Sequence, residues 1–378
     1  MNYVKLKDVC TINMGQSPSS DSYNENGHGV PFFQGNADFG ERYPVTRKWC
    51  SAPTKMAAPE DILISVRAPI GAMNYAKEEC CIGRGLAALT PNREKVAPEY
   101  IFWLLKGKNE ELNCKGTGST FKAIGRNILE ETLVPNISLE KQTECAIILE
   151  KTYRVILSRK QQLQKMDELV KARFVELFGD PATNPYGWQQ LTVNDVCVSV
   201  VRGPFGSALK KEFFVPPSDT TYKVYEQKHA IQKSSTIGTY YVTAEKYNEL
   251  RRFECHSGDI LMSCSGTMGE LYQLPAGCER GIINQALCKF TLNERILPIV
   301  FLAYMRETIG NLETKGSGIQ NIAAVSYVKA MPINLPPMRV QEQYATFVEQ
   351  TDKSKVAVQK ALDEAQLLFD SLMQKYFG

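Results

Sequence analysis

The residues of this chain that resemble parts of a catalytic site lack the partners that catalysis requires. Asn184-Pro185-Tyr186 is one proline short of the Asn-Pro-Pro-Tyr loop with which adenine methyltransferases grip a flipped base. Such a loop works beside a cofactor-binding strand that ends in a glycine-rich turn. The sequence shows no such strand and turn ahead of it, so we interpret this stretch as a linker.

Candidate ligands for a metal ion are equally isolated. The three histidines, His28, His229 and His256, have no carboxylate or cysteine at a spacing typical of metal sites, and Cys255-His256 stands alone. Glu60-Asp61 resembles half of a nuclease carboxylate set, but no Glu-x-Lys follows, and we expect these acids to cap a turn. Phosphate-binding loops, dinucleotide-binding turns and Gly-x-Ser-x-Gly are absent as well. The sequence therefore predicts no catalytic residue, no metal and no cofactor.

Composition is that of a folded protein with room for two domains. The chain has 378 residues, a net charge of +3 and 43% hydrophobic residues. Its eleven cysteines form no Cys-x-x-Cys pair, and the longest apolar run, 299–305, is too short to span a bilayer. With no export signal at the N-terminus, we expect reduced thiols, a cytoplasmic protein and no membrane partner. A net charge near zero does not exclude nucleic acid, because a basic groove can be local.

The chain repeats itself. Matching blocks follow one another in the same order, at offsets of 187, 198, 200, 201 and 199 residues. They are DVC at 8–10 and 195–197, DILIS at 61–65 with DILMS at 259–263, KGTGS at 115–119 with KGSGI at 315–319, Pro135 and Gln142 with Pro336 and Gln343, and Phe178-Gly179 with Phe377-Gly378. Two copies of one unit, about 185 residues each, are predicted.

Each copy has the same internal order of expected elements. Short apolar or alternating runs predict strands, among them VKLKDVCTI, DILISV and LAALT in copy one and LTVNDVCVSV, DILMS and ALCKFTL in copy two. A short helix follows, opened by Pro98 or Pro298 in the favoured first-turn position. A Lys-Gly-x-Gly turn, one more strand and a long helix complete the copy.

The two long helices carry an apolar seam. Residues step by four and three along each helix, and most of them are apolar, which is typical of a coiled coil. The seam positions are Leu149, Tyr153, Ile156, Lys160, Leu163, Asp167, Val170, Phe174 and Leu177, and then Tyr344, Val348, Thr351, Lys355, Val358, Leu362, Ala365, Phe369, Leu372 and Tyr376. We expect the helices to pair with each other. The alternative is that each packs on its own domain.

The domain limits follow from these elements. Gly179 suits the residue after a helix end, and Pro181 prevents the helix from continuing. We expect an α+β fold with two globular domains in tandem and two long helices in an antiparallel coiled coil. The expected ranges are 1–138 for the first domain, 139–179 for the central helix, 180–187 for the linker, 188–339 for the second domain and 340–378 for the C-terminal helix.

This order of parts resembles the specificity subunit of type I restriction–modification enzymes over essentially the whole chain. The segments that carry the resemblance are MGQSPSS at 14–20, VRGPFGSALK at 201–210, the DILIS and DILMS strands, CIGRGLAAL at 81–89, KGTGSTFKAI at 115–124, KGSGIQNIAAV at 315–325, LVPNISLEKQ at 133–142, NLPPMRVQEQ at 334–343 and the LFGDPATNPYGW linker.

The resemblance implies a non-catalytic subunit that directs a larger enzyme to DNA. Each globular domain would be a target-recognition domain that reads one half of a split, asymmetric site in double-stranded DNA. Two methyltransferase subunits would join the chain to methylate adenine. Two restriction subunits, ATP-dependent translocase-nucleases, would then join the core of two methyltransferase subunits and one specificity subunit.

The coiled coil would set the gap between the two half-sites. Half-site separation is a geometric property of a DNA-binding protein, and a helix of about 40 residues is roughly 60 Å long. One extra helical turn in the central helix adds about 5.4 Å, against about 3.4 Å per base pair. We therefore expect such an insertion to lengthen the gap by one or two base pairs.

Candidate DNA contacts fall into two sets. Phosphate contacts favour lysine, arginine, hydroxyl and amide groups on glycine-rich turns. That set is Lys115, Thr117, Ser119, Thr120, Lys122, Arg126, Lys315, Ser317, Gln320 and Asn321. Base contacts favour arginine, lysine, asparagine and glutamine where the copies differ most, at 34–48 and 222–252. That set is Gln34, Asn36, Arg47, Lys48, Arg67, Arg84, Lys210, Lys211, Lys228, His229, Arg251 and Arg252.

Other interpretations stay open for these residues and for the chain. The Lys-Gly-x-Gly turns are also compatible with solvated loops or with contacts to a methyltransferase subunit, and each base candidate with an ordinary surface charge. A duplicated non-catalytic adaptor is the alternative function. A methyltransferase or nuclease would need a cofactor or metal signature that the sequence lacks.

Overall fold

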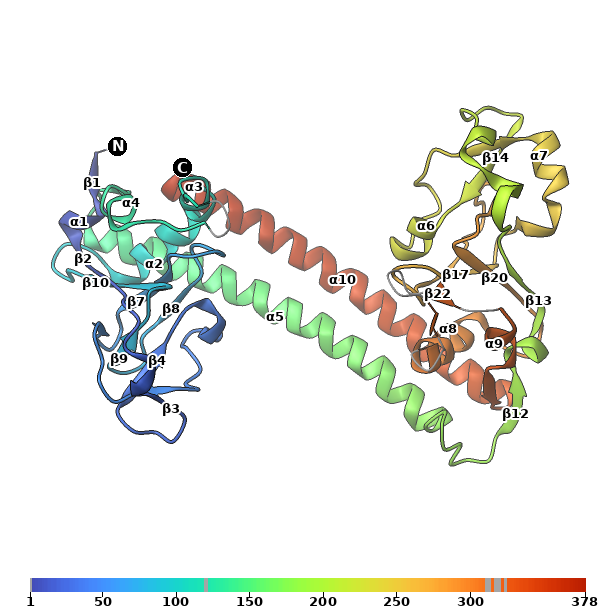
Figure 1. The fold of residues 1–378 in the computed structure, drawn as a ribbon, viewed down its shortest axis with the longest axis horizontal. Helices are drawn as coiled ribbons and strands as arrows, with labels where there is room; N and C mark the ends of the chain where they lie inside the picture. Colours follow the sequence, from blue (N-terminus) through green and yellow to red (C-terminus); the bar gives the residue numbers. More distant parts are fainter. Residues whose placement is uncertain (1, 119–121, 310–313, 316–320, 323–324) are drawn as a thin grey trace. The chain divides into compact units, whose positions relative to one another are not determined.

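The computed structural model describes residues 2–118, 122–309, 314–315, 321–322 and 325–378, with side chains for all of these except 314–315 and 321–322. The chain forms two compact units (Figure 1). The first unit comprises Met1–Gln161 and Val358–Gly378, and the second comprises Gln162–Ala357. Each unit holds one globular domain with one stretch of each long helix. The predicted α+β fold with two globular domains and two long helices is confirmed.

Both units contain the same four-stranded antiparallel sheet. In the first unit the strand order is β2-β10-β7-β8, and in the second it is β13-β20-β17-β18. The bounds are β2 Cys10–Met14, β7 Ile62–Ser65, β8 Met73–Tyr75, β10 Leu86–Pro91, β13 Cys197–Arg202, β17 Ile260–Ser263, β18 Leu271–Gln273 and β20 Leu287–Leu292. The DILIS and DILMS segments are the buried strands β7 and β17, as predicted.

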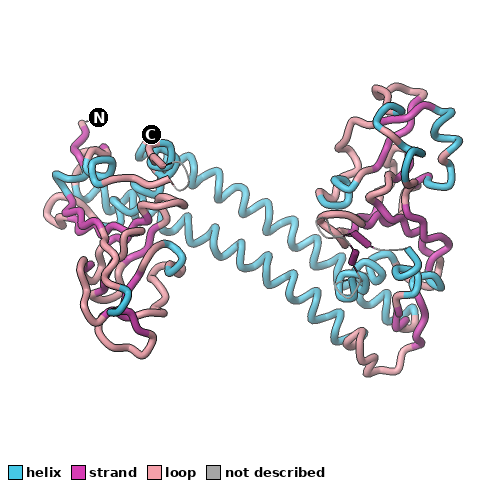
Figure 2. Tube along the Cα trace, viewed as in Figure 1, coloured by secondary structure: helices cyan, strands magenta, loops and turns pink. Residues whose placement is uncertain are grey.

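A second sheet in each unit is built around a parallel pair of strands. The order is β3-β5-β4-β9-β6 in the first unit and β15-β14-β19-β16 in the second, where β4 pairs with β9 and β14 with β19 in parallel. The bounds are β3 Tyr23–Asn24, β4 Val30–Phe33, β5 Trp49–Cys50, β6 Met56–Ala57, β9 Cys80–Ile82, β14 Thr221–Tyr225, β15 Tyr241–Thr243, β16 Glu254–Cys255 and β19 Gly281–Ile283. Figure 2 shows how short these strands are and how much loop joins them.

The remaining elements frame the sheets. Helix α2 begins at Pro98 and α8 at Pro298, as predicted, and each buries an apolar face. The helices are α1 Leu6–Val9, α2 Pro98–Gly107, α3 Asn109–Cys114, α4 Arg126–Glu130, α5 Leu139–Phe178, α6 Gln227–Ile231, α7 Ala244–Glu249, α8 Pro298–Thr308, α9 Val325–Ala330 and α10 Met338–Phe377. The two-stranded sheets pair β1 Tyr3–Lys5 with β11 Leu133–Pro135, β12 Gln189–Thr192 with β23 Pro332–Leu335, and β21 Thr314–Lys315 with β22 Asn321–Ile322.

The prediction of one continuous strand at the start of each copy is wrong. A helical turn, α1 in copy one and a 3-10 turn at Val193–Val196 in copy two, separates two strands that join different sheets. The aspartate of the DVC repeat explains the turn. Asp8 accepts a hydrogen bond from Lys5 N at 3.1 Å, and Asp195 accepts one from Thr192 N at 2.8 Å, so each carboxylate satisfies an amide at the start of the turn.

The long helices pair antiparallel within each unit, and the seam lies between them. In the second unit Asp167 of α5 bonds Lys355 of α10 at 2.7 Å, while Phe178 packs on Tyr344 at 5.1 Å between ring centroids. Residue numbers thus rise on one helix as they fall on the other. In the first unit Tyr153 faces Phe369 across the seam. Within the part of the chain that the structure describes, no helix is long and apolar enough to cross a membrane.

A buried glutamine fastens the start of each long helix to its domain. Gln142 Oε1 accepts a hydrogen bond from Ala97 N, just before α2, and its Nε2 donates to Ile137 O, both at 2.9 Å. Gln341 accepts from Leu297 N, just before α8, at 2.9 Å and donates to Pro336 O at 3.0 Å. The repeat thus matches Gln142 with Gln341. Our pairing of Gln142 with Gln343 was two residues out of register.

We expect Gln142→Ala and Gln341→Ala each to lower the free energy of unfolding by about 1–3 kcal/mol, because each leaves a buried amide and a carbonyl without a partner. Chemical denaturation of the full chain measures this. Gln343→Ala is the matched control on an exposed position of α10 and should change stability by no more than about 0.5 kcal/mol. An equal loss from all three variants would contradict the assigned register.

Candidate nucleic-acid interface

Backbone hydrogen bonds draw four segments of the first unit together where the parallel strands β4 and β9 end. Gly85 N donates to Gln34 O at 3.2 Å, Val66 N donates to Gly85 O at 2.9 Å, and Ile124 N donates to Val66 O at 2.9 Å. Because the carboxyl ends of parallel strands meet at one edge of a sheet, the residues after β4 and β9 become neighbours there. We call the segments 34–38, 66–68, 83–85, 117–118 and 122–124 the first turn cluster.

Several predicted base contacts meet in this cluster. Gln34 Nε2 donates to Ser17 Oγ at 2.8 Å, and Arg84 N donates to the same oxygen at 3.3 Å. Arg67 pairs with Ala123 through an isolated β-bridge, beside Lys122. The side chains of Gln34, Arg67, Arg84 and Lys122 are all exposed. A single edge of the domain therefore presents cations and an amide to solvent.

The loop after β4 adds three more candidates next to Gln34. Asn36 begins a 3-10 turn whose Asp38 carboxylate accepts a hydrogen bond from Gln34 N at 2.8 Å. Arg47 Nη1 donates to Ala37 O at 3.4 Å, and Lys48 O accepts from Phe32 N at 2.9 Å. The structure thus brings together the six base candidates that were predicted for copy one.

Only some of the phosphate candidates of copy one are available for contacts in the first turn cluster. Thr117 exchanges two backbone hydrogen bonds with Ala123 and lies in the cluster with Lys122. Lys115 is paired with Glu111, and Arg126 Nη2 donates to Ile12 O at 2.7 Å, so both cations already have protein partners. Ser119 and Thr120 lie outside the described residues.

The second unit repeats this arrangement with different side chains. Asn284 N donates to Tyr225 O at 2.9 Å, as Gly83 N does to Phe33 O in the first unit. Gln227 Nε2 donates to the carbonyl oxygens of Ser265 and Thr267, and Arg202 Nε donates to Gln285 O at 3.4 Å. We call the turns at 201–203, 226–228, 264–267 and 284–286 the second turn cluster.

Four residues of the second cluster were missed by the sequence analysis. Gln227, Ser265 and Gln285 come from turns that match 34–38, 66–68 and 83–85, and Arg202 precedes Gly203, the counterpart of Gly15. The internal repeat relates two of them to predicted contacts of copy one, because Ser265 lies 198 residues after Arg67 and Gln285 lies 201 residues after Arg84. Carrying the candidates of copy one across the repeat would have found Ser265 and Gln285, whereas Arg202 and Gln227 correspond to Met14 and Gly35, which were not candidates.

The predicted contacts of copy two lie in separate places. Lys228 follows Gln227, and its ammonium pairs with Glu226 at 2.7 Å. The segment 208–214, which contains Lys210 and Lys211, packs with Phe253 on a hydrophobic core of the second sheet, so these lysines lie near Arg251 and Arg252. All four cations are exposed.

The prediction that His229 contacts a DNA base is wrong. Its ring is fully buried, Nδ1 accepts from Glu226 N at 2.8 Å and Nε2 lies 2.7 Å from Ile237 O. Burial lowers the pKa of His229, which favours the neutral ring. Both nitrogens serve the local backbone, so this side chain is unavailable to DNA.

The remaining candidates fall where the structure gives no side chains. Ser317 and Gln320 lie outside the described residues, and only the backbone of Lys315 and Asn321 is described, in β21 and β22.

A glycine lets the loop after the first sheet strand approach each cluster. A Cβ at Gly15 would overlap the carbonyl oxygen of Gly83, and a Cβ at Gly203 would overlap that of Asn284. These are the glycines of MGQSPSS and VRGPFGSALK. Only a residue without a side chain fits at either position, so the repeat retains glycine where the surrounding side chains differ.

The described part of the chain contains no group of three or more histidine, cysteine or acidic side chains that could hold a metal ion. The exposed turn residues offer hydrogen-bond donors and positive charge. That chemistry suits the recognition of phosphates and base edges.

The family model of the type I restriction modification DNA specificity domain matches residues 1–167 and 185–365. The chain belongs to this family. The two matched ranges correspond to the two copies predicted from the internal repeat, so the chain carries the specificity domain twice.

Known proteins support the same assignment. The putative type I restriction enzyme MjaX specificity subunit of Methanocaldococcus jannaschii is 41% identical over 160 residues, which cover 42% of this chain and 38% of that relative. The match thus spans less than half of the relative's length.

Two solved structures share the fold over 100% of this chain. One is the type I restriction–modification S subunit from M. genitalium, with a TM-score of 0.59, 13% identity and 96% of that chain covered. The other belongs to work on complex assembly and conformational transition of the type I R-M system, with a TM-score of 0.64, 17% identity and 97% of that chain covered.

We expect Gly15→Ala and Gly203→Ala each to destabilise the specificity domain that carries it by about 1–3 kcal/mol, because backbone must shift to relieve the overlap. Hydrogen exchange should then be faster at the amide of Leu86 or Leu287, because each donates to the carbonyl oxygen, of Gly83 or Asn284, that the added Cβ would displace. Gly125→Ala is the control, since a Cβ there meets nothing within 4 Å. Unchanged exchange in both variants would refute the close-approach role.

Proposed function

We propose that this chain recognises a bipartite, asymmetric sequence in double-stranded DNA, with one half-site read by each specificity domain. Family membership supports DNA sequence recognition, and the absence of an identified catalytic group in the sequence fits a subunit that directs other subunits. The protein would act in the cytoplasm, where its DNA target lies.

The observation that carries this proposal is a shared backbone scaffold with different side chains. Both turn clusters are held by matching hydrogen bonds, of Gly83 N or Asn284 N to the end of the neighbouring strand. At equivalent points the first cluster presents Arg67 and Arg84, and the second presents Ser265 and Gln285. Arginine favours guanine, whereas glutamine favours adenine. Reading two different half-sites requires this kind of difference.

We assign the contacts accordingly. In the first domain the base-reading set is Gln34, Asn36, Arg47, Lys48, Arg67 and Arg84, with Thr117 and Lys122 at phosphates. In the second domain Arg202, Gln227, Lys228, Ser265 and Gln285 form the corresponding set. Lys210, Lys211, Arg251 and Arg252 extend the DNA-facing surface of that domain.

The partners follow from the family. We propose that two methyltransferase subunits bind the chain to form a core that methylates adenine in each half-site, and that two restriction subunits join this core. The long paired helices α5 and α10 would fix the gap between the half-sites.

Methylation mapping tests the proposal. The chain is co-expressed with its methyltransferase subunit in a host without other adenine methylation, and modified adenines are located by long-read sequencing. We expect one bipartite motif, modified once on each strand. An assembled complex that leaves DNA unmodified would refute DNA recognition and favour the adaptor function.

Exchange of one domain should change one half of that motif. Replacing 188–335 with the same region of another family member should alter a single half-site and preserve the other. Within one domain, we expect Arg84→Ala to relax the preference at one base pair, a loss of about 1–3 kcal/mol of discrimination. Lys115→Ala is the matched control, because that lysine is already paired with Glu111. Equal effects of the two variants would remove Arg84 from the base-reading set.

Lengthening both helices should widen the gap. One heptad inserted after residue 161 of α5 and one after residue 357 of α10 retains the seam and adds about 10 Å. At about 3.4 Å per base pair, the gap should grow by about three base pairs while both half-sites stay the same. The same insertion in the linker at 180–187 should leave the gap unchanged. If the gap stays the same after both heptads are inserted, the helices do not set the distance between the half-sites.

A further inference from the structure

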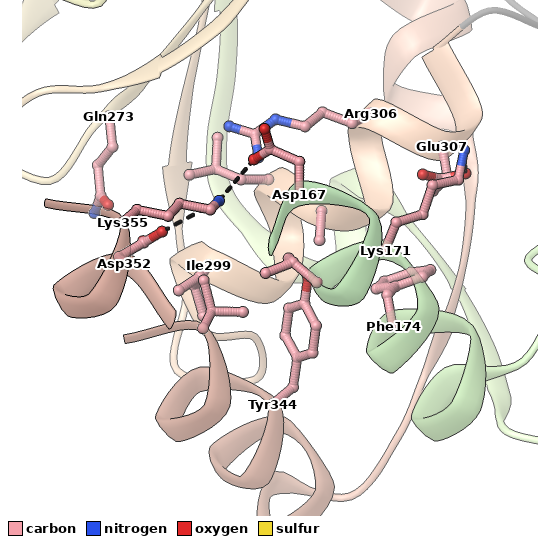
Figure 3. Close-up of a pocket in the computed structure, with 14 residues that line it drawn as sticks. Asp167, Lys171, Phe174, Gln273, Ile299, Arg306, Glu307, Tyr344, Asp352 and Lys355 are labelled. Atoms are coloured by element: carbon pink, nitrogen blue, oxygen red, sulfur yellow. Dashed lines mark hydrogen bonds and ion pairs between the residues drawn. The ribbon is translucent and has the colours of Figure 1, made fainter. Parts of the chain in front are cut away.

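A cavity of about 590 Å³ opens in the second unit between α5, α8 and α10 (Figure 3). Its apolar wall includes Phe174, Ile299, Ala303, Tyr344 and Val348. Ligand sites in proteins commonly have volumes of roughly 300–1,000 Å³. The cavity is partly open to solvent and is large enough to admit a side chain of another molecule.

The internal repeat shows what occupies the same place in the first unit. Helices α2 and α8 begin at Pro98 and Pro298, so Ala303 stands where copy one has Trp103. The Trp103 indole is buried, with its ring centroid 5.3 Å from that of Tyr153 and 5.6 Å from that of Phe369. An indole therefore fills this position in copy one.

The neighbours of the indole have also become smaller or polar in copy two. Helices α5 and α10 begin at Leu139 and Met338, so Tyr153 corresponds to Asp352 and Phe369 corresponds to Val170. Asp352, Val170 and Ala303 all line the cavity. The cavity is thus the space that an aromatic cluster fills in the first unit.

One cation that lines the cavity, Arg306, has no aromatic ring beside it in the described part of the chain, unlike its counterpart Lys106 in the first unit. Lys106 Nζ lies 3.7 Å from the ring centroid of Tyr153 and 5.2 Å from that of Trp103. The equivalent residue, Arg306, lines the cavity, and its side chain points toward Asp167 in Figure 3. Among the described residues, neither an aromatic ring nor a carboxylate pairs with it. The two lysines of the lining are neutralised, Lys355 by Asp167 at 2.7 Å and Lys171 by Glu307 at 3.3 Å.

We propose that the cavity receives a large aromatic side chain, of the size of an indole, from a protein subunit that assembles with this chain. The apolar wall would take the ring, and the Arg306 guanidinium would lie over its face in a cation–π contact. Because the occupant belongs to another subunit, this inference rests on the proposed function. It makes the two units unequal, since the first fills the place with its own Trp103.

Indole itself is the probe for the site. Saturation-transfer NMR on the full chain should detect indole binding to the wild-type protein. Ala303→Trp should abolish the signal by placing an indole there covalently, while Ala303→Ser should keep it. Absence of binding to the wild-type chain, or equal binding to Ala303→Trp, would overturn the assignment of an aromatic site.

The complex with its methyltransferase subunits tests whether a partner uses the site. Removal of one well-packed aromatic contact typically weakens an interface on the order of tenfold to a hundredfold. We expect a loss of that size in the assembly affinity of Ala303→Trp, and a smaller loss for Arg306→Gln, which keeps the cavity and removes the cation. Assembly with wild-type affinity in both variants would refute the proposal.

The wild-type complex distinguishes this inference from the proposed function. If the wild-type complex assembles and methylates a bipartite motif, the proposed function stands whatever the variants do. Arg306→Gln is an exposed change on α8 and serves as the readout if Ala303→Trp does not fold.

Discussion

The apolar seam along α5 and α10 is the constraint on which both units depend. A helix of 40 residues with one apolar stripe exposes that stripe to water unless another surface covers it. Each unit solves this by pairing the two helices and packing its domain against them. In the second unit Phe174, Phe178 and Tyr344 belong to the same hydrophobic core as strands β13, β17 and β20. The seam is therefore part of the domain core, and a polar substitution in it would disturb the sheet as well.

Comparison of the two copies separates the residues that the fold requires from those that can vary. The buried Gln142 and Gln341, the glycines Gly15 and Gly203 and the four-stranded sheets are retained in both copies. Each of them satisfies a buried amide or permits a close backbone approach, so an exchange would cost stability. The exposed side chains at the ends of β4, β9, β14 and β19 do not have this structural role, and they differ between the two copies. A recognition surface can change there without loss of the fold.

The sequence predicted the elements that local patterns determine. The seam, the proline-started helices α2 and α8 and the buried strands β7 and β17 follow from spacing alone. The parallel pairs β4–β9 and β14–β19 were not predicted, because they join segments that are distant in the chain. In copy one the structure brings the six base candidates together, and their contact with DNA stays a prediction. In copy two His229 looked exposed in a polar stretch, yet the loop that ends at Ile237 encloses its ring, a contact without a local signal.

The first unit is built from two stretches of chain that are far apart in the sequence, and this affects how it folds during synthesis. Its core closes only when 358–378 are present, since Phe369 packs on Trp103 and Phe377 lies 5.2 Å from Tyr100. A ribosome releases the first domain well before these residues, because the second copy lies between them in the chain. The first domain must therefore wait, with Trp103 uncovered, while the whole second copy is translated. A stop codon ahead of residue 358 would thus damage the first domain, although that domain is encoded upstream of the second copy.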